Sequence, residues 1–99
     1  MAMRYVFKAR MWLYPGKAGW RFVTLPVKIS QGIRKLTSGA TRGFGSVRVV
    51  ATIGSTSWKT SIFPDTKRSA FLLPIKADVR KREAIKDDVA VEVAIELDI

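Results

Sequence analysis

The sequence predicts a single, mainly β domain with two short helices. Three observations lead to this prediction. Apolar and polar residues alternate along most of the chain, which is the pattern of strands that bury one face. Two short segments change to a helical period, and each of them follows a Leu-Pro pair. The order of elements is also the same in both halves: a strand ends, a helix begins, and another strand follows.

The chain is expected to open with a β-hairpin. Its first strand covers residues 4–14, and the apolar side chains expected in the core are Tyr5, Phe7, Ala9, Met11 and Leu13. A turn rich in glycine, residues 15–19, leads into a second strand over residues 20–25. Trp20 in this strand and Trp58 later in the chain are interpreted as core anchors, because aromatic rings bury large apolar surfaces.

The first helix is predicted to begin after Pro26. Ile29, Ile33 and Leu36 then fall on one face at a helical spacing. Gly32 lies in the middle and costs about 1 kcal/mol relative to alanine, so packing must hold this helix. Residues 37–46 are rich in glycine, serine and threonine and are expected to form a loop.

A second hairpin is predicted in the centre of the chain. Residues 47–53 and 56–63 lie on either side of Gly54-Ser55, and glycine at the first turn position favours a type II′ turn. A short strand over residues 70–73 ends at Pro74, and a helix over about 75–84 follows. The last strand is the clearest, since five side chains face one way: Val89, Val91, Val93, Ile95 and Leu97.

An internal echo links the two helices. Leu25-Pro26-Val27-Lys28 and Leu73-Pro74-Ile75-Lys76 lie 48 residues apart in the same context. This echo predicts a pseudo-twofold duplication inside one domain over residues 1–99, with half-repeats at about 4–53 and 47–98. The alternative is a chance match, because four residues are few.

Charge is unevenly distributed along the chain. The 18 lysines and arginines outnumber the 8 aspartates and glutamates, which gives a formal charge of +10. Residues 1–64 hold 11 basic side chains and no acidic one, whereas residues 65–99 hold 7 basic and 8 acidic ones. A field of one sign attracts polyanions or anionic lipid through Coulomb forces. The basic N-terminal two-thirds therefore suggests a class of partner without identifying it.

The sequence contains neither cysteine nor histidine. Disulfides, thiolate nucleophiles, imidazole bases and the usual ligands of zinc, haem and iron–sulfur clusters are therefore excluded. Ser57, Lys59 and Ser61 alternate as in an ordinary strand, and Asp87-Asp88 is interpreted as a turn. We expect no catalytic residue, no metal site, no cofactor and no enzymatic activity.

No segment has the length or composition of a membrane anchor. The longest wholly apolar run, residues 70–75, has six residues and contains Pro74. A transmembrane helix needs about 20 residues, and Arg4, Lys8 and Arg10 interrupt any secretory signal. Without cysteines to indicate an oxidising compartment, we expect a cytoplasmic protein with no membrane partner.

Four segments carry a resemblance to a known family. They are Trp20 to Pro26, Gly45-Ser46-Val47-Arg48-Val49, Trp58 to Pro64, and Leu72 to Lys76 followed by Val79-Arg80-Lys81. Together they resemble the bacterial family known as domain of unknown function 1905. The resemblance implies a small double-split β-barrel capped by two short helices, the architecture of the swapped-hairpin transition-state regulators. A duplicated chain would complete alone a barrel that shorter relatives build from two chains, so we expect a monomer.

Basic and aromatic side chains alternate along the first strand. Lys8, Arg10, Trp12 and Tyr14 share one face and combine cations with stacking surfaces, as single-strand binding proteins do. The candidate residues for nucleic-acid contact are Lys8, Arg10, Trp12, Arg34, Lys35, Arg42, Arg48 and Lys59. The alternative is a solvated face that keeps a small β protein soluble and its edges unpaired.

We expect a non-enzymatic binding module that contacts nucleic acid mainly through phosphates, with low sequence specificity. Residues 42–49 approach an RNA-recognition motif, but that fold needs a helix where residues 15–19 predict a turn. The resembled family has no assigned activity, so two alternatives stay open. One is an accessory protein–protein interaction domain with an acidic partner. The other is small-molecule binding in the mouth of the barrel.

Overall fold

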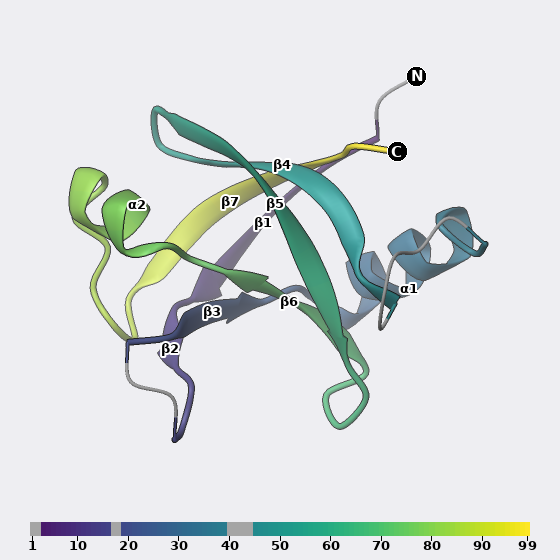
Figure 1. Cartoon of the computed structure of the whole chain (residues 1–99), viewed down its shortest axis with the longest axis horizontal. Coiled ribbons are helices and arrows are strands. Elements are labelled where there is room, and N and C mark those ends of the chain that lie inside the picture. Colours follow the sequence, from purple (N-terminus) through teal and green to yellow (C-terminus); the bar gives the residue numbers. More distant parts are fainter. Residues whose placement is uncertain (1–2, 17–18, 40–44) are drawn as a thin grey trace.

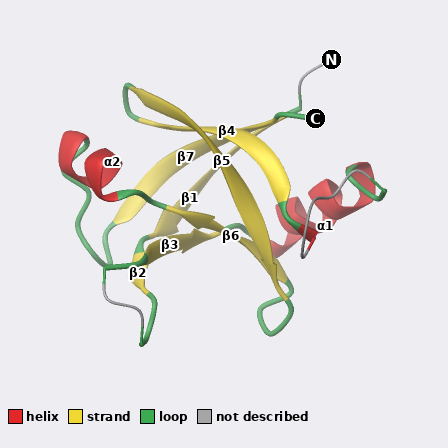
Figure 2. Ribbon diagram, viewed as in Figure 1, coloured by secondary structure: helices red, strands yellow, loops and turns green. Residues whose placement is uncertain are grey.

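A computed structural model describes residues 3–16, 19–39 and 45–99 (Figures 1 and 2). The strands are β1 (Arg4–Arg10), β2 (Trp12–Leu13), β3 (Arg21–Thr24), β4 (Val47–Ile53), β5 (Thr56–Asp65), β6 (Ala70–Pro74) and β7 (Ala90–Leu97). The helices are α1 (Val27–Leu36) and α2 (Ala77–Arg82). The prediction of a mainly β fold with two short helices is therefore confirmed.

The seven strands form one antiparallel sheet in the order β1-β7-β4-β5-β6-β3-β2. Its two edge strands, β1 and β2, are consecutive in the chain and are separated only by Met11. One stretch of chain therefore serves both edges, and the sheet curls into a half-barrel around the core (Figure 1). Met11 itself is 1% exposed and packs in that core.

The break at Met11 corrects the prediction of one continuous strand over residues 4–14. β1 pairs with β7 through Arg10, and β2 then pairs with β3 on the opposite edge. The alternation of the first strand does not continue through the break, and Leu13 is 50% exposed rather than buried. A period-two pattern places side chains correctly only while the chain keeps pairing with the same neighbour.

Two inner ladders of the sheet each contain one pair with the same separation along the sequence. Thr24 of β3 pairs with Leu72 of β6, and Val49 of β4 pairs with Leu97 of β7. Each pair is 48 residues apart, which is also the spacing of the Leu-Pro echo in the sequence. The duplication with half-repeats at about 4–53 and 47–98 stays a prediction. Helices α1 and α2 lie on opposite sides of the sheet in this view (Figure 1).

Helix α1 begins after Pro26 as predicted, but its buried face differs from the prediction. Leu36 is 50% exposed, and the buried positions are Ser30, Ile33 and Thr37. The two hydroxyls can be buried because the backbone satisfies them. Ser30 Oγ accepts a hydrogen bond from the Phe71 N–H at 3.0 Å, and Thr37 Oγ1 donates to the Ile33 carbonyl at 2.7 Å. Residues 40–44 of the predicted loop lie outside the described residues.

Helix α2 is shorter than predicted, because residues 75 and 76 precede it and residues 83 and 84 follow it. Val79 is the buried residue of the helix, and Ile75 enters the core just before it. The helix is thus a short cap held by two apolar contacts with the core. Among the described residues, no helix is long and apolar enough to cross a membrane.

The central hairpin forms as predicted. Gly54 takes a φ of +58° at the first turn position, between Ile53 and Thr56, which pair with each other. The core consists of the inward side chains of the sheet, and Val49, Ala51, Val93 and Ile95 are all fully buried. Trp58 packs against this core at its margin. The prediction that Trp20 anchors the core is wrong, because its side chain is 54% exposed.

Candidate functional site

The basic side chains of β1 face acidic ones on β7. Lys8 pairs in register with Glu92, and Arg4 pairs with Glu96. Directly paired residues lie on the same face of a sheet, and all four of these side chains are exposed. Basic and acidic residues that are far apart in the sequence therefore lie side by side here, because β7 places its carboxylates next to the basic first strand.

Arg48 and Lys59 lie on the other side of the same acidic strand. β7 stands between β1 and β4 in the sheet, and β5 follows β4. Both side chains are exposed, but the two glutamates of β7 separate them from Lys8. Arg10 is held at the end of β1, where its Nη1 donates to the Asp88 carbonyl at 3.3 Å. These four candidates do not form one uninterrupted basic surface.

The other basic candidates belong to α1 and the segment behind it. Arg34 and Lys35 lie in the last turn of the helix, where cations interact favourably with the helix dipole. The guanidinium of Arg34 lies 5.8 Å from the centre of the Phe71 ring. Arg42 lies outside the described residues. The structure thus assigns local contacts to Arg34 and leaves Lys35 exposed at the surface.

Trp12, the remaining candidate, belongs to a cluster of four aromatic rings. Its ring centroid lies 6.0 Å from that of Tyr14 and 5.5 Å from that of Phe22. Trp20 completes the cluster at 6.2 Å from Tyr14 and 6.4 Å from Phe22. The rings are tilted or edge-on, which is the favourable arrangement for aromatic pairs. The cluster therefore forms a preorganised apolar surface on the β2–β3 hairpin.

Strand register explains why these side chains meet on one face. Phe22 pairs with Trp12 of β2 on one side and with Pro74 of β6 on the other. In the next row, Leu72 of β6 pairs with Phe63 of β5. Because paired residues share a face, an apolar band crosses four strands on the outer side of the sheet. The hairpin is also closed at its loop end, where the Tyr14 N–H donates to the Trp20 carbonyl at 2.9 Å.

This band forms the floor of a groove of about 770 Å³. Its lining residues are Tyr14, Gly19, Trp20, Arg21, Phe22, Phe63, Leu72, Pro74, Ile75, Lys76, Ala77 and Arg80. Trp20 is 54% exposed and Phe63 is 42% exposed, so ring surface is accessible inside the groove. Three of the lining residues are basic and none is acidic. We refer to this site as the aromatic groove.

The basic residues of the aromatic groove differ in how they are held. Asp87 binds Arg21 through two contacts, from Nε to Oδ1 at 3.2 Å and from Nη2 to Oδ2 at 3.3 Å. Lys76 is exposed just before α2. The Nε atom of Arg80 is buried and has no hydrogen-bond partner among the described residues. A buried N–H group without a partner is uncommon in folded proteins and indicates a place where a polar ligand atom or water fits.

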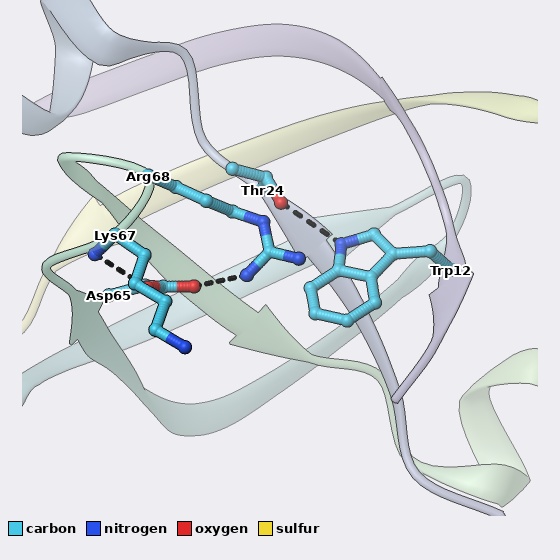
Figure 3. A network of polar contacts seen from close by, with 5 residues as sticks. All are labelled: Trp12, Thr24, Asp65, Lys67 and Arg68. Atoms are coloured by element: carbon cyan, nitrogen blue, oxygen red, sulfur yellow. Dashed lines mark hydrogen bonds and ion pairs between the residues drawn. The ribbon is translucent and has the colours of Figure 1, made fainter. Parts of the chain in front are cut away.

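Trp12 is fixed from behind by a polar network (Figure 3). Its Nε1 donates to Thr24 Oγ1 at 3.0 Å, and the guanidinium of Arg68 lies 4.5 Å from the centre of its ring. Arg68 in turn forms an ion pair with Asp65, which also accepts a hydrogen bond from the Lys67 N–H at 3.0 Å. Such a cation over an indole ring holds the ring in place.

The same network sets the acidity of Asp65. Burial alone would raise the pKa of this carboxyl group, but the hydrogen bond and the charge of Arg68 act in the opposite direction. Together with backbone N–H groups, they hold the pKa of Asp65 below its ordinary value of 3.8. Asp65 therefore stays ionised and keeps Arg68 over the tryptophan ring at neutral pH.

The interpretation of the sequence missed Trp20, Phe22 and Phe63 as residues that line the groove. A signal was available for the first two, because Trp12 and Tyr14 precede the turn at a spacing of two, and Trp20 and Phe22 follow it at the same spacing. In a hairpin, two such pairs end on one face. Phe63 reaches the groove only through the pairing of β5 with β6.

Comparison with known proteins gives one family. The profile of a family described as a domain of unknown function (DUF1905) matches residues 7–95. The match includes every strand of the sheet at least in part and both helices. No curated protein matches the chain. Within the described residues, no three acidic side chains are grouped in a way that could hold a metal ion.

Proposed function

The chain belongs to the family described as a domain of unknown function (DUF1905), and from its geometry we propose that it is a non-enzymatic binding module for single-stranded nucleic acid. The aromatic groove is the binding site in this proposal. The observation that carries it is the lining of the groove, where exposed aromatic rings lie beside three basic side chains and no acidic one.

Stacking supplies the first part of the argument. Every nucleobase has a flat apolar face, and stacking on an aromatic side chain contributes about 1 to 3 kcal/mol per base. Trp20 and Phe63 offer such faces at opposite sides of the groove, from β2–β3 and from β5. Bases in a duplex are already stacked on one another, so a groove of this kind favours unpaired strands.

Charge supplies the second part. Phosphates are attracted to Arg21, Lys76 and Arg80 at the groove, whereas Glu92 and Glu96 repel them from the face of β1 and β7. The proposed site therefore keeps Trp12 as a support of the cluster and moves the phosphate contacts away from Lys8. Because stacking accepts any base, low sequence specificity is expected.

The proposal is tested by fluorescence anisotropy with labelled single-stranded DNA, single-stranded RNA and duplex DNA of equal length. We expect single strands to bind more tightly than the duplex, with binding that persists at about 150 mM salt. Equal affinity for duplex and single strands would overturn it, and so would loss of all binding at that salt. Enrichment of one acidic protein after nuclease treatment would favour a protein-interaction domain instead.

We also propose that the module works as a monomer. The two edge strands, β1 and β2, are consecutive in the chain, so one chain passes directly from one edge of the curled sheet to the other. No second chain is needed to supply an edge strand. A sedimentation mass of 11.1 kDa is expected. A mass of twice that value would contradict the proposal.

A further inference from the structure

A second hollow adjoins the aromatic groove on the side of α2. It has a volume of about 440 Å³ and lies between α2, the turn that follows it, and the ends of β1 and β3. Its lining residues are Met11, Arg21, Ala77, Arg80, Lys81, Ile85, Lys86 and Asp87. Four of these residues are basic and one is acidic.

The hollow and the groove are two parts of one surface. Arg21 and Arg80 line both of them. Arg80 belongs to α2 and borders both spaces. Arg21 is the first residue of β3, and its backbone carbonyl accepts a hydrogen bond from the Ile75 N–H at 2.9 Å. A ligand that fills the groove therefore meets the same two guanidinium groups as a ligand that fills the hollow.

The charge of the hollow is not neutralised from within. Asp87 is its single carboxylate, and both of its oxygens are engaged by Arg21. Arg80, Lys81 and Lys86 form no ion pair with any described carboxylate. The Nε–H of Arg80 is buried and without a partner among the described residues. Arg80, Lys81 and Lys86 thus line one hollow without a described carboxylate to pair with them.

We propose that this hollow is a phosphate subsite, which takes a phosphodiester of the strand whose neighbouring base stacks in the aromatic groove. This inference rests on the proposed function and adds to it where the backbone of the strand lies. Guanidinium groups suit phosphate because their N–H donors form a planar fork, and lysines add charge without fixed geometry. Asp87 has a supporting role, since it holds Arg21 in one orientation at the border of the two spaces.

A matched pair of variants on α2 tests the subsite. Lys81 lines the hollow, whereas its neighbour Arg82 is also exposed but lines neither space. Lys81→Gln and Arg82→Gln remove the same charge from adjacent positions. Each phosphate contact on a single strand contributes about 0.7 to the slope of log K against log salt. We expect Lys81→Gln to lower this slope by about that amount and Arg82→Gln to leave it nearly unchanged.

The phosphate itself is tested with an uncharged linkage. A short strand in which one phosphodiester is replaced by a methylphosphonate is compared with the unmodified strand. We expect wild-type protein and Arg82→Gln to bind the best-placed modified strand several-fold more weakly, and Lys81→Gln to show a smaller difference. If the methylphosphonate has the same effect in all three proteins at every position, the subsite is wrong.

A third measurement separates failure of the subsite from failure of the proposed function. Inorganic phosphate is titrated while the Nε–H resonance of Arg80 is followed by NMR. A shift that disappears in Lys81→Gln supports the subsite even if single strands do not bind, in which case free phosphate groups are the ligand chemistry. If strands bind but Lys81→Gln and Arg82→Gln behave alike, the groove proposal stands and the subsite is overturned.

Discussion

Glu83 closes over Gly54 and ties α2 to the central hairpin. Its Oε2 accepts a hydrogen bond from Thr56 Oγ1 at 2.6 Å, just across the turn between β4 and β5. A Cβ atom on Gly54 would lie 2.0 Å from Glu83 Oε1, and the φ of this glycine is +58°. A side chain at residue 54 would therefore displace the Glu83 carboxylate from its contact with the turn.

Gly54→Ala is expected to destabilise the fold by about 2 to 4 kcal/mol. The alanine is strained at positive φ, and the glutamate must move away and lose its hydrogen bond to Thr56. Gly39→Ala is the matched control, because Gly39 also has a positive φ but no atom within 4 Å of its added Cβ. Urea denaturation measures both variants, and equal losses would show that Glu83 contributes nothing.

Trp20→Ala is expected to weaken single-strand binding roughly 5- to 150-fold, which corresponds to the loss of one stacked base. The fold should lose little stability, because the side chain is 54% exposed. Leu13→Ala is the control, since Leu13 is 50% exposed on the same hairpin and does not line the groove. Anisotropy titrations would contradict the groove if both variants bind like the wild type.

Lys76→Gln is expected to lower the slope of log K against log salt by about 0.7. Lys8→Gln should leave this slope close to the wild-type value. Lys76 lines the groove, and Lys8 stands opposite Glu92 on the sheet. The two variants remove the same charge, so a general effect of net charge would change both slopes equally. Titrations at several salt concentrations distinguish the two results.

Asp65→Asn is expected to lower stability near neutral pH by less than about 1 kcal/mol. The folded pKa of Asp65 lies below its ordinary value of 3.8, so its contribution is present above that pH and is lost as the pH falls through the folded pKa. The melting temperatures of the variant and the wild type should therefore converge in acid. A difference that stays constant from about pH 7 to about pH 2 would rule out this carboxylate as the cause.

Ser30→Ala is expected to cost about 1 to 3 kcal/mol, because the Phe71 N–H would remain buried without an acceptor. Ser38→Ala is the control, since Ser38 is exposed just beyond the same helix. Thermal or urea unfolding measures the difference. Similar stability of the two variants would mean that water replaces the hydroxyl at Phe71.

Local patterns in the sequence are sufficient to predict most strands and both helices. They do not predict which elements pack together or which side chains stay exposed. Alternation predicted β4, β5 and β7, and Pro26 and Pro74 marked the approach to the two helices. The spacing of Trp12, Tyr14, Trp20 and Phe22 indicates that these rings share a face, but whether other strands cover that face depends on distant parts of the chain. The pairing of Lys8 with Glu92 joins residues from opposite ends of the chain. Counting charges along the sequence therefore cannot predict that these two residues lie side by side.

The candidate site shows the same division. Trp12 and Tyr14 were identified as stacking residues from their own strand, and both belong to the aromatic cluster. Lys76, Arg80 and Lys81 of the groove and the hollow do not stand out in the sequence, because they lie in the C-terminal third, where acidic residues balance the count. Pairing of Asp87 with Arg21, and of the glutamates with β1, leaves these three cations available.

The placement of β1 beside β7 also governs when the fold can be completed. Phe7 pairs with Val93, so the first strand of this sheet in chain order is joined to its last. During translation β1 has no strand to pair with until residues 90–97 leave the ribosome. Until then its apolar side chains stay exposed to water. Closing so long a loop of chain is entropically costly, and folds with a high contact order form slowly. The sheet is therefore expected to form only once residues 90–97 are available, as one cooperative step, rather than half by half.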